Sequence, residues 1–435
     1  MGELYSVLKR FCEEAARGVA CEPSLPATIM WEHYSTPVYG HSRMKTVPAW
    51  TEVAANIVTR LTAQDVGKEA IAALEADTNV GRHMGQPAGN ADGVDKVTVH
   101  GCLSGLVSAL FARQGKAACD VRVFDTLYHE FRLFFDSDTI VYRYVAPVSG
   151  IKVAADRLQI GDYRHVARAT TADRARMIGP AHYVQPYAPA FVCDATIECE
   201  IVTEKIVGDV PAGDKGKWLQ HAESKLEQMC TAIRLVVDAR IHFDEIHIWP
   251  KHWNPVATDL MLTLSLGPRR SDYQEFSVAH ANEVSELLKR LEALAGDGSL
   301  EQALRRFNFG YNRASNEDRI VDHLIAFESL LLEKNDMNEL SYRLAHRGAA
   351  LIGDDAQRRR EVFHLLREAY TQRSRIVHGQ KPRALVRVEG VSFTFDQLVG
   401  ASEDMLRESI CRAVTTLSND PEVKLVELLE ARIFG

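Results

Sequence analysis

The chain has 435 residues, of which 46% are hydrophobic and 25% are charged, and its formal net charge is −8 at pH 7. This length allows two to four domains with a sizeable core, and the composition is that of a soluble globular protein. No apolar run approaches the length needed to cross a bilayer and no signal-peptide pattern opens the sequence, so we expect no membrane partner.

Cysteine and histidine spacing argues against a metal centre. The eight cysteines are scattered and none forms a C-x-x-C pair, which favours free thiols in a reducing, cytoplasmic compartment. His242, His247 and His252 recur every five residues, but this interval in a strand places neighbours on opposite faces. We therefore expect no metal and no cofactor.

Residues 1–94 are expected to form a helical N-terminal segment. An amphipathic helix is predicted over 3–17, a Pro-rich connection over 23–48 and helical structure over 50–76. Residues 81–93 are predicted to be a loop from their glycine, proline and asparagine content. This loop lacks the Gly-Lys-Ser/Thr ending of a phosphate-binding P-loop.

From about residue 95 the hydrophobic pattern changes to the two-residue period of strands. Strands are predicted at Val97–His100, Val121–Phe124, Glu130–Phe135, Thr139–Tyr142, Thr196–Val202, Ile241–Ile248 and Leu260–Leu266. A long helix is predicted over 218–239, after a turn at 208–217. Cys193 and Cys199 are expected to be small core residues. We interpret residues 95–300 as a mixed, largely antiparallel α/β domain with a sensing or regulatory role.

The chain after residue 279 is nearly all helical in pattern. Helices are predicted at 280–295, 299–308, 316–334, 337–352, 356–378, 402–417 and 421–433. A short β excursion is predicted over 385–391. The expected fold class is therefore α+β, with the mixed region followed by an all-α helical bundle over 301–435.

Basic residues concentrate in one part of this acidic chain. Residues 343–381 hold nine Lys or Arg residues against four Asp or Glu residues. Such a cluster is typical of a nucleic-acid contact, although a solvated helix face carries one as well.

Three successive predicted helices each place one charged residue on an apolar stripe. Glu328 follows Leu324 by four positions, and Arg347 and Arg373 occupy similar positions on the next two helices. A buried charge is costly unless it is paired, so we expect an internal ion-pair network. The network either orients the helices only or also tunes a functional site.

An arginine and a histidine lie five positions apart, directly before Gly379. The planar guanidinium of Arg373 is suited to phosphate, and His378 can take and give a proton near neutral pH. On a regular helix the two side chains point about 140° apart. Convergence requires a distorted helix end or a two-fold interface. Alternatively, His378 simply caps the end of the helix.

Three segments in this order resemble the HEPN superfamily, and more narrowly its ApeA-like branch. They are Arg319–Leu331, Glu339–Arg347 and Tyr370–Gly379, and the resemblance covers about residues 305–420. In that family, an R-x(4–6)-H motif with a polar residue after the arginine marks a metal-independent endoribonuclease. The resemblance also implies a helical bundle that forms a homodimer, with both motifs facing a shared cleft.

The resemblance implies a role for each candidate residue. His378 would act as base on the ribose 2′-OH or as acid toward the leaving 5′-oxygen, while Arg373 would hold the phosphate. Ser374 would orient the imidazole, Tyr370 would support the guanidinium or contact a base, and Glu328 would position Arg373. Further RNA contacts are expected from Arg375, Arg347 and Lys381.

We therefore expect RNA as the partner and 2′,3′-cyclic phosphate products, because the attacking hydroxyl belongs to the RNA. ApeA-like proteins are associated with anti-phage defence by RNA cleavage, often of tRNA. By this resemblance the chain would be a toxin or defence effector, with a phage or regulatory trigger acting on residues 1–300. Some family members lack the motif, so a non-catalytic dimerisation or RNA-binding module is the alternative.

Overall fold

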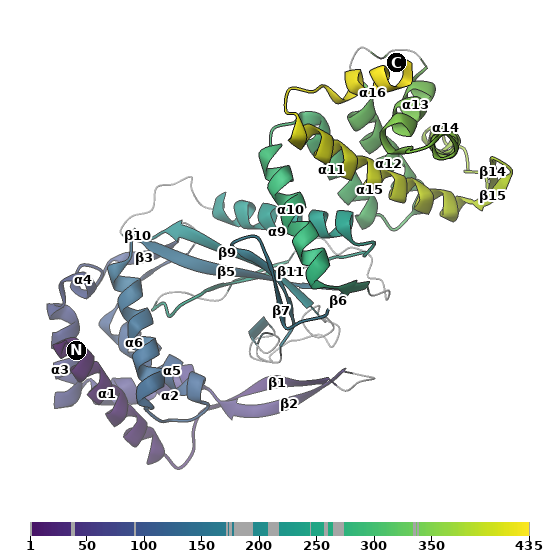
Figure 1. Cartoon of the computed structure of the whole chain (residues 1–435). Coiled ribbons are helices and arrows are strands. Elements are labelled where there is room, and N and C mark those ends of the chain that lie inside the picture. Colours follow the sequence, from purple (N-terminus) through teal and green to yellow (C-terminus); the bar gives the residue numbers. More distant parts are fainter. Residues whose placement is uncertain are drawn as a thin grey trace. The chain divides into compact units, whose positions relative to one another are not determined.

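The computed structural model describes residues 2–35, 40–90, 93–170, 173, 176–177, 195–207, 217–243, 245–255, 260–263, 274–333, 336 and 339–434. Helices combine with antiparallel sheets and a helical C-terminal region, which confirms the α+β class (Figure 1). The chain forms two compact units. Unit 1 comprises Met1–Val148, Asp162–Leu226 and Asp244–Leu264, and unit 2 comprises Ser149–Gly161, Glu227–Phe243 and Ser265–Gly435.

Unit 1 opens with a group of helices. They are α1 (Glu3–Ala20), α2 (Trp50–Leu61), α3 (Asp65–Ala76), α4 (Thr78–Gly81), α5 (Val99–Gln114) and α6 (Val121–Asp136). Helix α1 buries Leu8, Phe11 and Ala15 at helical spacing. Its Tyr5 hydroxyl donates to Asp125 Oδ1 of α6 at 2.5 Å. Residues 1–94, which were expected to form a separate segment, thus belong to the same compact unit as residues that follow them in the sequence.

Three expected strands in unit 1 are wrong, because they lie wholly or partly in helices. Val121–Phe124 and Glu130–Phe135 both belong to α6, and Val97–His100 runs into the start of α5. The side chains of Phe124, Leu127 and Phe131 recur at spacings of three and four and are fully buried. Two side-chain caps start these helices. The Asp120 carboxylate accepts the N–H groups of residues 122 and 123, and the Thr98 hydroxyl accepts that of residue 101.

Antiparallel strands form the rest of unit 1. Five neighbouring strands of the six-stranded main sheet lie in unit 1, in the order β12 (Leu260–Thr263), β11 (Glu245–Pro250), β5 (Thr139–Val148), β9 (Ala195–Glu204) and β8 (Arg164–Arg168). Of these, β11, β5 and β9 are labelled in Figure 1. Smaller sheets contain β1 (Ala27–Ser35), β2 (Gly40–Pro48), β3 (Pro87–Asn90), β4 (Gly93–Lys96) and β10 (Ile206–Val207). The first four of these smaller strands replace the irregular segments expected at 23–48 and 81–93.

The long helix expected at 218–239 is confirmed as α9 (Lys217–Val236). Cys199 is buried, as expected. Cys193 and most of the turn expected at 208–217 lie outside the described residues.

Unit 2 is a helical bundle with small strands at its edges. Its helices are α10 (Val278–Ala293), α11 (Gly298–Asn312), α12 (Asn316–Leu331), α13 (Leu340–Ile352), α14 (Ala356–Val377), α15 (Phe395–Asn419) and α16 (Leu425–Phe434). Its strands are β6 (Ile151–Val153), β7 (Arg157–Ile160), β13 (Gln274–Phe276), β14 (Leu385–Val388) and β15 (Val391–Thr394). All seven expected helices and the β excursion are confirmed.

The boundaries of unit 2 differ from the segment expected at 301–435. Helix α10 belongs to the bundle, where it packs against α15. The Arg290 guanidinium of α10 donates to the Thr415 hydroxyl of α15 at 3.1 Å. Hydrophobic periodicity predicts where helices lie along the chain, but it does not predict which compact unit each helix packs into.

A buried charge network crosses the bundle interior. Arg319 of α12 forms an ion pair with Glu403 of α15, and both side chains are only 4% exposed. The fully buried His323 ring lies 3.7 Å from the same carboxylate. Burial lowers the pKa of His323 to about 4, so the ring is neutral at pH 7. The ion pair is thus shielded from solvent, and removing either partner would leave the other charge buried and uncompensated.

We predict that Glu403→Gln lowers the free energy of unfolding of unit 2 by about 3–5 kcal/mol, because it leaves the buried Arg319 charge uncompensated. Asp404→Asn, one position along α15 with a 65% exposed side chain, is the matched control and should change it by less than about 0.5 kcal/mol. Urea denaturation of the full chain, followed by hydrogen exchange of α12 and α15, measures both. Equal effects of the two substitutions would contradict the structural role of the pair.

Candidate functional site

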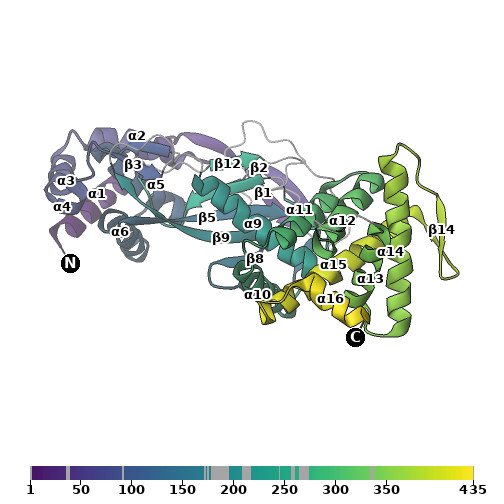
Figure 2. The ribbon, with the colours of Figure 1, turned by 90° about the horizontal axis from the view of Figure 1, so that it is seen from above.

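The Arg-His motif lies at the C-terminal end of α14, beside the β14–β15 hairpin (Figure 2). The helix stays regular to Val377 and then closes with two main-chain hydrogen bonds. Gly379 N–H donates to Ile376 O at 2.9 Å, and Gln380 N–H donates to Arg375 O at 2.8 Å. This is a Schellman motif, and Gly379 takes the left-handed φ of +72° that it requires.

Arg373 is held in place by the neighbouring helix. Its Nη2 lies 3.4 Å from Glu328 Oε2 of α12, and both side chains are 23% exposed. Its guanidinium carbon lies 5.6 Å from the centre of the Tyr370 ring. Its Nε is buried and has no hydrogen-bond partner within the described chain. The guanidinium is therefore oriented by protein groups, while the side chain as a whole keeps partial exposure.

Tyr370 and Glu328 act on each other as well. Burial and the Glu328 charge, together with a hydrogen bond to that carboxylate, raise the pKa of Tyr370. Glu328 thus contacts both the arginine and the tyrosine of the motif. The expected pairing of Glu328 with Arg373 is observed.

His378 is exposed and occupies the C-cap position of α14. Its main-chain N–H donates to Ser374 O at 3.1 Å. Among the residues that the structure describes, no hydrogen bond or ion pair joins its side chain to Arg373. Because α14 is regular to Val377, a distorted helix end does not bring the pair together. Of the two expected routes to convergence, only the two-fold interface stays open as a prediction.

Two polar side chains tie the segment after the helix back to α14. Arg375 donates through Nε and Nη2 to Lys381 O, at 3.2 and 3.0 Å. The fully buried Gln372 accepts the Arg383 N–H at 2.8 Å through its side-chain oxygen. These contacts fix the chain on both sides of His378. Sequence reasoning missed Gln372, although its position three residues after Ala369 on the buried stripe was a usable signal.

The other expected contacts differ in accessibility. The Ser374 side chain is half-buried, and its hydroxyl has no hydrogen-bond partner among the described residues. Lys381 is exposed, so its side chain is accessible to RNA. The Arg375 guanidinium already donates two hydrogen bonds to Lys381 O, and these hold the segment that follows α14.

The expected RNA contact of Arg347 conflicts with its environment. The side chain is 3% exposed and lies 2.5 Å from both Asp336 and Glu430. It also donates to Leu331 O at 2.9 Å. The three inward charges expected from the sequence therefore do not form one network. Glu328 pairs with Arg373, whereas Arg347 finds its partners in a connecting segment and in the last helix.

Unit 1 contains a buried polar cluster that the sequence did not indicate. Glu198 Oε2 on β9 lies 3.1 Å from His165 Nε2 on β8 and 2.8 Å from Arg143 Nη2 on β5. Burial alone would raise the pKa of Glu198, but His165 and Arg143 outweigh it and lower the pKa to about 2. This carboxylate therefore stays charged on the sheet.

The histidines with five-residue spacing do not converge. His247 of β11 is buried, and its Nε2 lies 3.1 Å from Glu245 Oε1. Within the described ranges, no group of three or more His, Cys, Asp or Glu side chains is arranged to hold a metal ion. No described helix combines the length and the apolar character needed to span a membrane.

Comparisons with known protein families, with curated proteins and with solved structures gave no match.

We predict that Glu328→Gln lowers the pKa of Tyr370 toward its ordinary value near 10, since the substitution removes the charge that disfavours the phenolate. NMR titration of protein labelled at the tyrosine ring carbon measures this change. Glu361→Gln removes a more exposed carboxylate from α14 and is the control, for which the Tyr370 pKa should not move. A Tyr370 pKa that is the same in the parent and in Glu328→Gln would refute the contact.

Proposed function

We propose that this chain is a metal-independent endoribonuclease of the HEPN type, with Arg373 and His378 as its catalytic residues. One observation carries the proposal. At the end of α14, a half-buried arginine is oriented by Glu328 and Tyr370, while an exposed histidine is held at a fixed main-chain position. An oriented phosphate-binding group and an accessible proton carrier are what phosphodiester transesterification requires.

The proposed reaction uses the ribose of the substrate as the nucleophile. The 2′-oxygen forms a bond to phosphorus while the bond from phosphorus to the 5′-oxygen breaks, which leaves a 2′,3′-cyclic phosphate. His378 takes the proton of the 2′-hydroxyl or gives a proton to the leaving 5′-oxygen. Arg373 stabilises the negative charge that builds on the phosphate oxygens. DNA lacks the attacking hydroxyl and would resist cleavage.

We propose a homodimer because one chain does not bring the two side chains together. Five positions on a regular helix separate them by about 140°. Apolar side chains are exposed close to the motif, with Val377 56%, Leu385 66% and Val391 58% accessible. Burying them against a second copy would stabilise a two-fold interface at this end of the bundle.

The biological role that we propose follows from the resemblance to the ApeA-like branch. The chain would act as a toxin or anti-phage defence effector, with RNA and not DNA as its target. Transfer RNA is the substrate class that the resemblance favours. Unit 1 would receive the phage or regulatory trigger.

The second candidate is a non-catalytic module that dimerises or binds RNA. The observation in its favour is that His378 serves as a helix cap and makes no contact with Arg373 within the described chain. A histidine near a helix C-terminus is favoured by the helix dipole without any catalysis.

We predict that the purified chain cleaves RNA in the presence of EDTA, and that Arg373→Ala and His378→Ala each lower the rate by about 100-fold or more. Gel analysis of total RNA and of tRNA, with end-group analysis of the products, measures this. Arg305→Ala and His364→Ala remove exposed side chains elsewhere in unit 2 and should leave the rate unchanged. Intact RNA in every sample, or full activity in both motif variants, would favour the non-catalytic module.

We also predict that mixing the two inactive variants restores activity. If Arg373 of one subunit works with His378 of the other, a mixed dimer has one complete site, and random exchange gives about a quarter of the parent rate. Subunits mixed under dissociating conditions and then reassembled provide the measurement. Each variant reassembled alone is the control. No recovery despite demonstrated subunit exchange would exclude a site shared between subunits.

A further inference from the structure

A pocket of about 330 Å³ lies between α13, α14 and α16 in unit 2. It is distinct from the Arg-His motif, because Arg359 lies about 21 Å from Arg373 at a rise of about 1.5 Å per residue of α14. Its volume falls at the lower end of the range for small-ligand sites. It is lined by His346, Ala349, Ala350, Arg359, Arg360, Phe363, Arg432 and Ile433.

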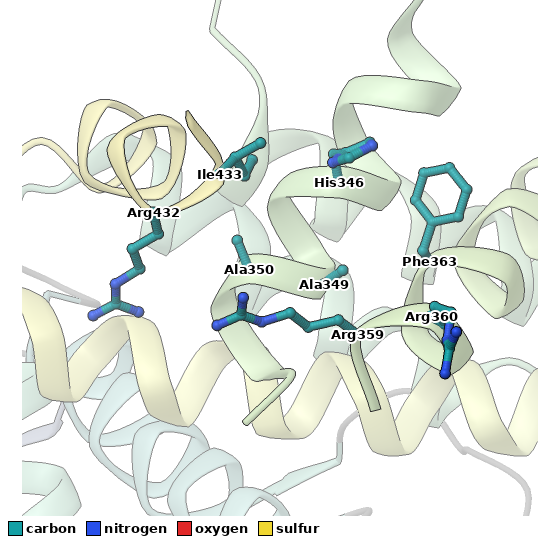
Figure 3. Close-up of a pocket in the computed structure, with 8 residues that line it drawn as sticks. All are labelled: His346, Ala349, Ala350, Arg359, Arg360, Phe363, Arg432 and Ile433. Atoms are coloured by element: carbon teal, nitrogen blue, oxygen red, sulfur yellow. The ribbon is translucent and has the colours of Figure 1, made fainter. Parts of the chain in front are cut away.

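The charged side chains that line this pocket are all positive. Its lining contains three arginines and no carboxylate. Among the described residues, none of Arg359, Arg360 and Arg432 forms an ion pair. In Figure 3 the side chain of Arg359 extends toward Arg432 across the pocket. Like charges that share a pocket repel one another, so this arrangement favours a bound anion.

Asp354, which precedes α14, does not balance the charge of these arginines. Asp354 feels the charge of Arg359 but is bound by both terminal nitrogens of Arg412, at 2.7 and 2.8 Å. The Arg359 Nε donates to Gly353 O at 3.0 Å, which leaves its terminal nitrogens directed into the pocket region. Guanidinium groups of this kind bind phosphate oxygens through paired hydrogen bonds.

One wall of the pocket is aromatic. The His346 and Phe363 rings have centroids 4.9 Å apart at an interplanar angle of 72°. Both rings lie at the end of the pocket away from Arg432 (Figure 3). Ala349, Ala350 and Ile433 supply apolar surface between these two ends. A planar base can stack on such a wall, and stacking tolerates any base because each has a π-face.

We propose that this pocket binds a single nucleotide, with its phosphate on Arg359 and Arg432 and its base against Phe363 and His346. The cationic end and the aromatic end lie within one cavity of suitable volume, which matches a ligand that carries both groups. The nucleotide is either free or the 5′-phosphorylated end of an RNA chain, since both present the same chemistry. This site does not depend on the proposed nuclease activity.

Isothermal titration calorimetry of the full chain with AMP, adenosine, inorganic phosphate and a 5′-phosphorylated or unphosphorylated oligoadenylate tests the proposal. AMP should bind at least tenfold more tightly than either adenosine or inorganic phosphate. Arg432→Gln and the double variant Arg359→Gln/Arg432→Gln should weaken AMP binding by about tenfold or more. Phe363→Leu should weaken the binding of AMP but not that of inorganic phosphate.

Arg432→Gln is the cleanest variant, because Arg432 is exposed and makes no hydrogen bond or ion pair with a described residue. Arg305→Gln is the matched control and should bind AMP as the parent does. Arg373→Ala should also bind AMP normally, which separates failure of this site from failure of the nuclease motif. Tighter binding of the phosphorylated oligoadenylate than of AMP identifies an RNA end, and equal or weaker binding identifies a free nucleotide.

Two results would overturn the proposal. The first is no binding of AMP or of the phosphorylated oligoadenylate to the parent chain at millimolar concentration. The second is binding of inorganic phosphate as tight as that of AMP and unaffected by Phe363→Leu, which would make the pocket a simple anion site.

Discussion

The close contact between Gly348 of α13 and Leu366 of α14 fixes the helix on which the candidate sites depend. A Cβ at position 348 would lie 2.4 Å from Leu366 Cδ1, so only glycine allows this approach without movement of the leucine. The contact lies near the middle of α14, within the hydrophobic core of unit 2. The first turns of the helix line the pocket and its last turn carries the Arg-His motif, so one packed element positions both.

Burial separates two arginines that look alike in the sequence. Arg347 and Arg373 both lie on apolar stripes, yet Arg347 is enclosed by two carboxylates while Arg373 has one partner and partial exposure. A fully enclosed guanidinium whose charge is balanced stays with its partners, because breaking the pair would leave a buried charge uncompensated. A half-buried guanidinium with one carboxylate partner remains partly accessible to an incoming anion. Accessibility, more than residue type, therefore divides structural from functional charges in this bundle.

The sequence predicted the helices of unit 2 and the pairing of Glu328 with Arg373, because neighbouring helices with strong apolar periodicity must bring their stripes together. It did not predict the partners of Arg347, since Glu430 is 83 residues away and Asp336 lies in a connection without periodicity. In α6, the alternation of Val121, Arg122 and Val123 resembled a strand, whereas the buried phenylalanines repeat at helical spacing. The pocket was also missed, because its walls come from three helices whose relative rotation no local pattern specifies.

The side chains of Gln372 and Arg375 form hydrogen bonds with main-chain groups of the segment that follows His378. The path of that segment is therefore set by side chains in the last turns of α14. A change at either position would release the histidine from its place while every residue of the motif remained present. Loss of function in such a variant would reflect lost positional order rather than lost chemistry, and the two would look identical in an activity assay alone.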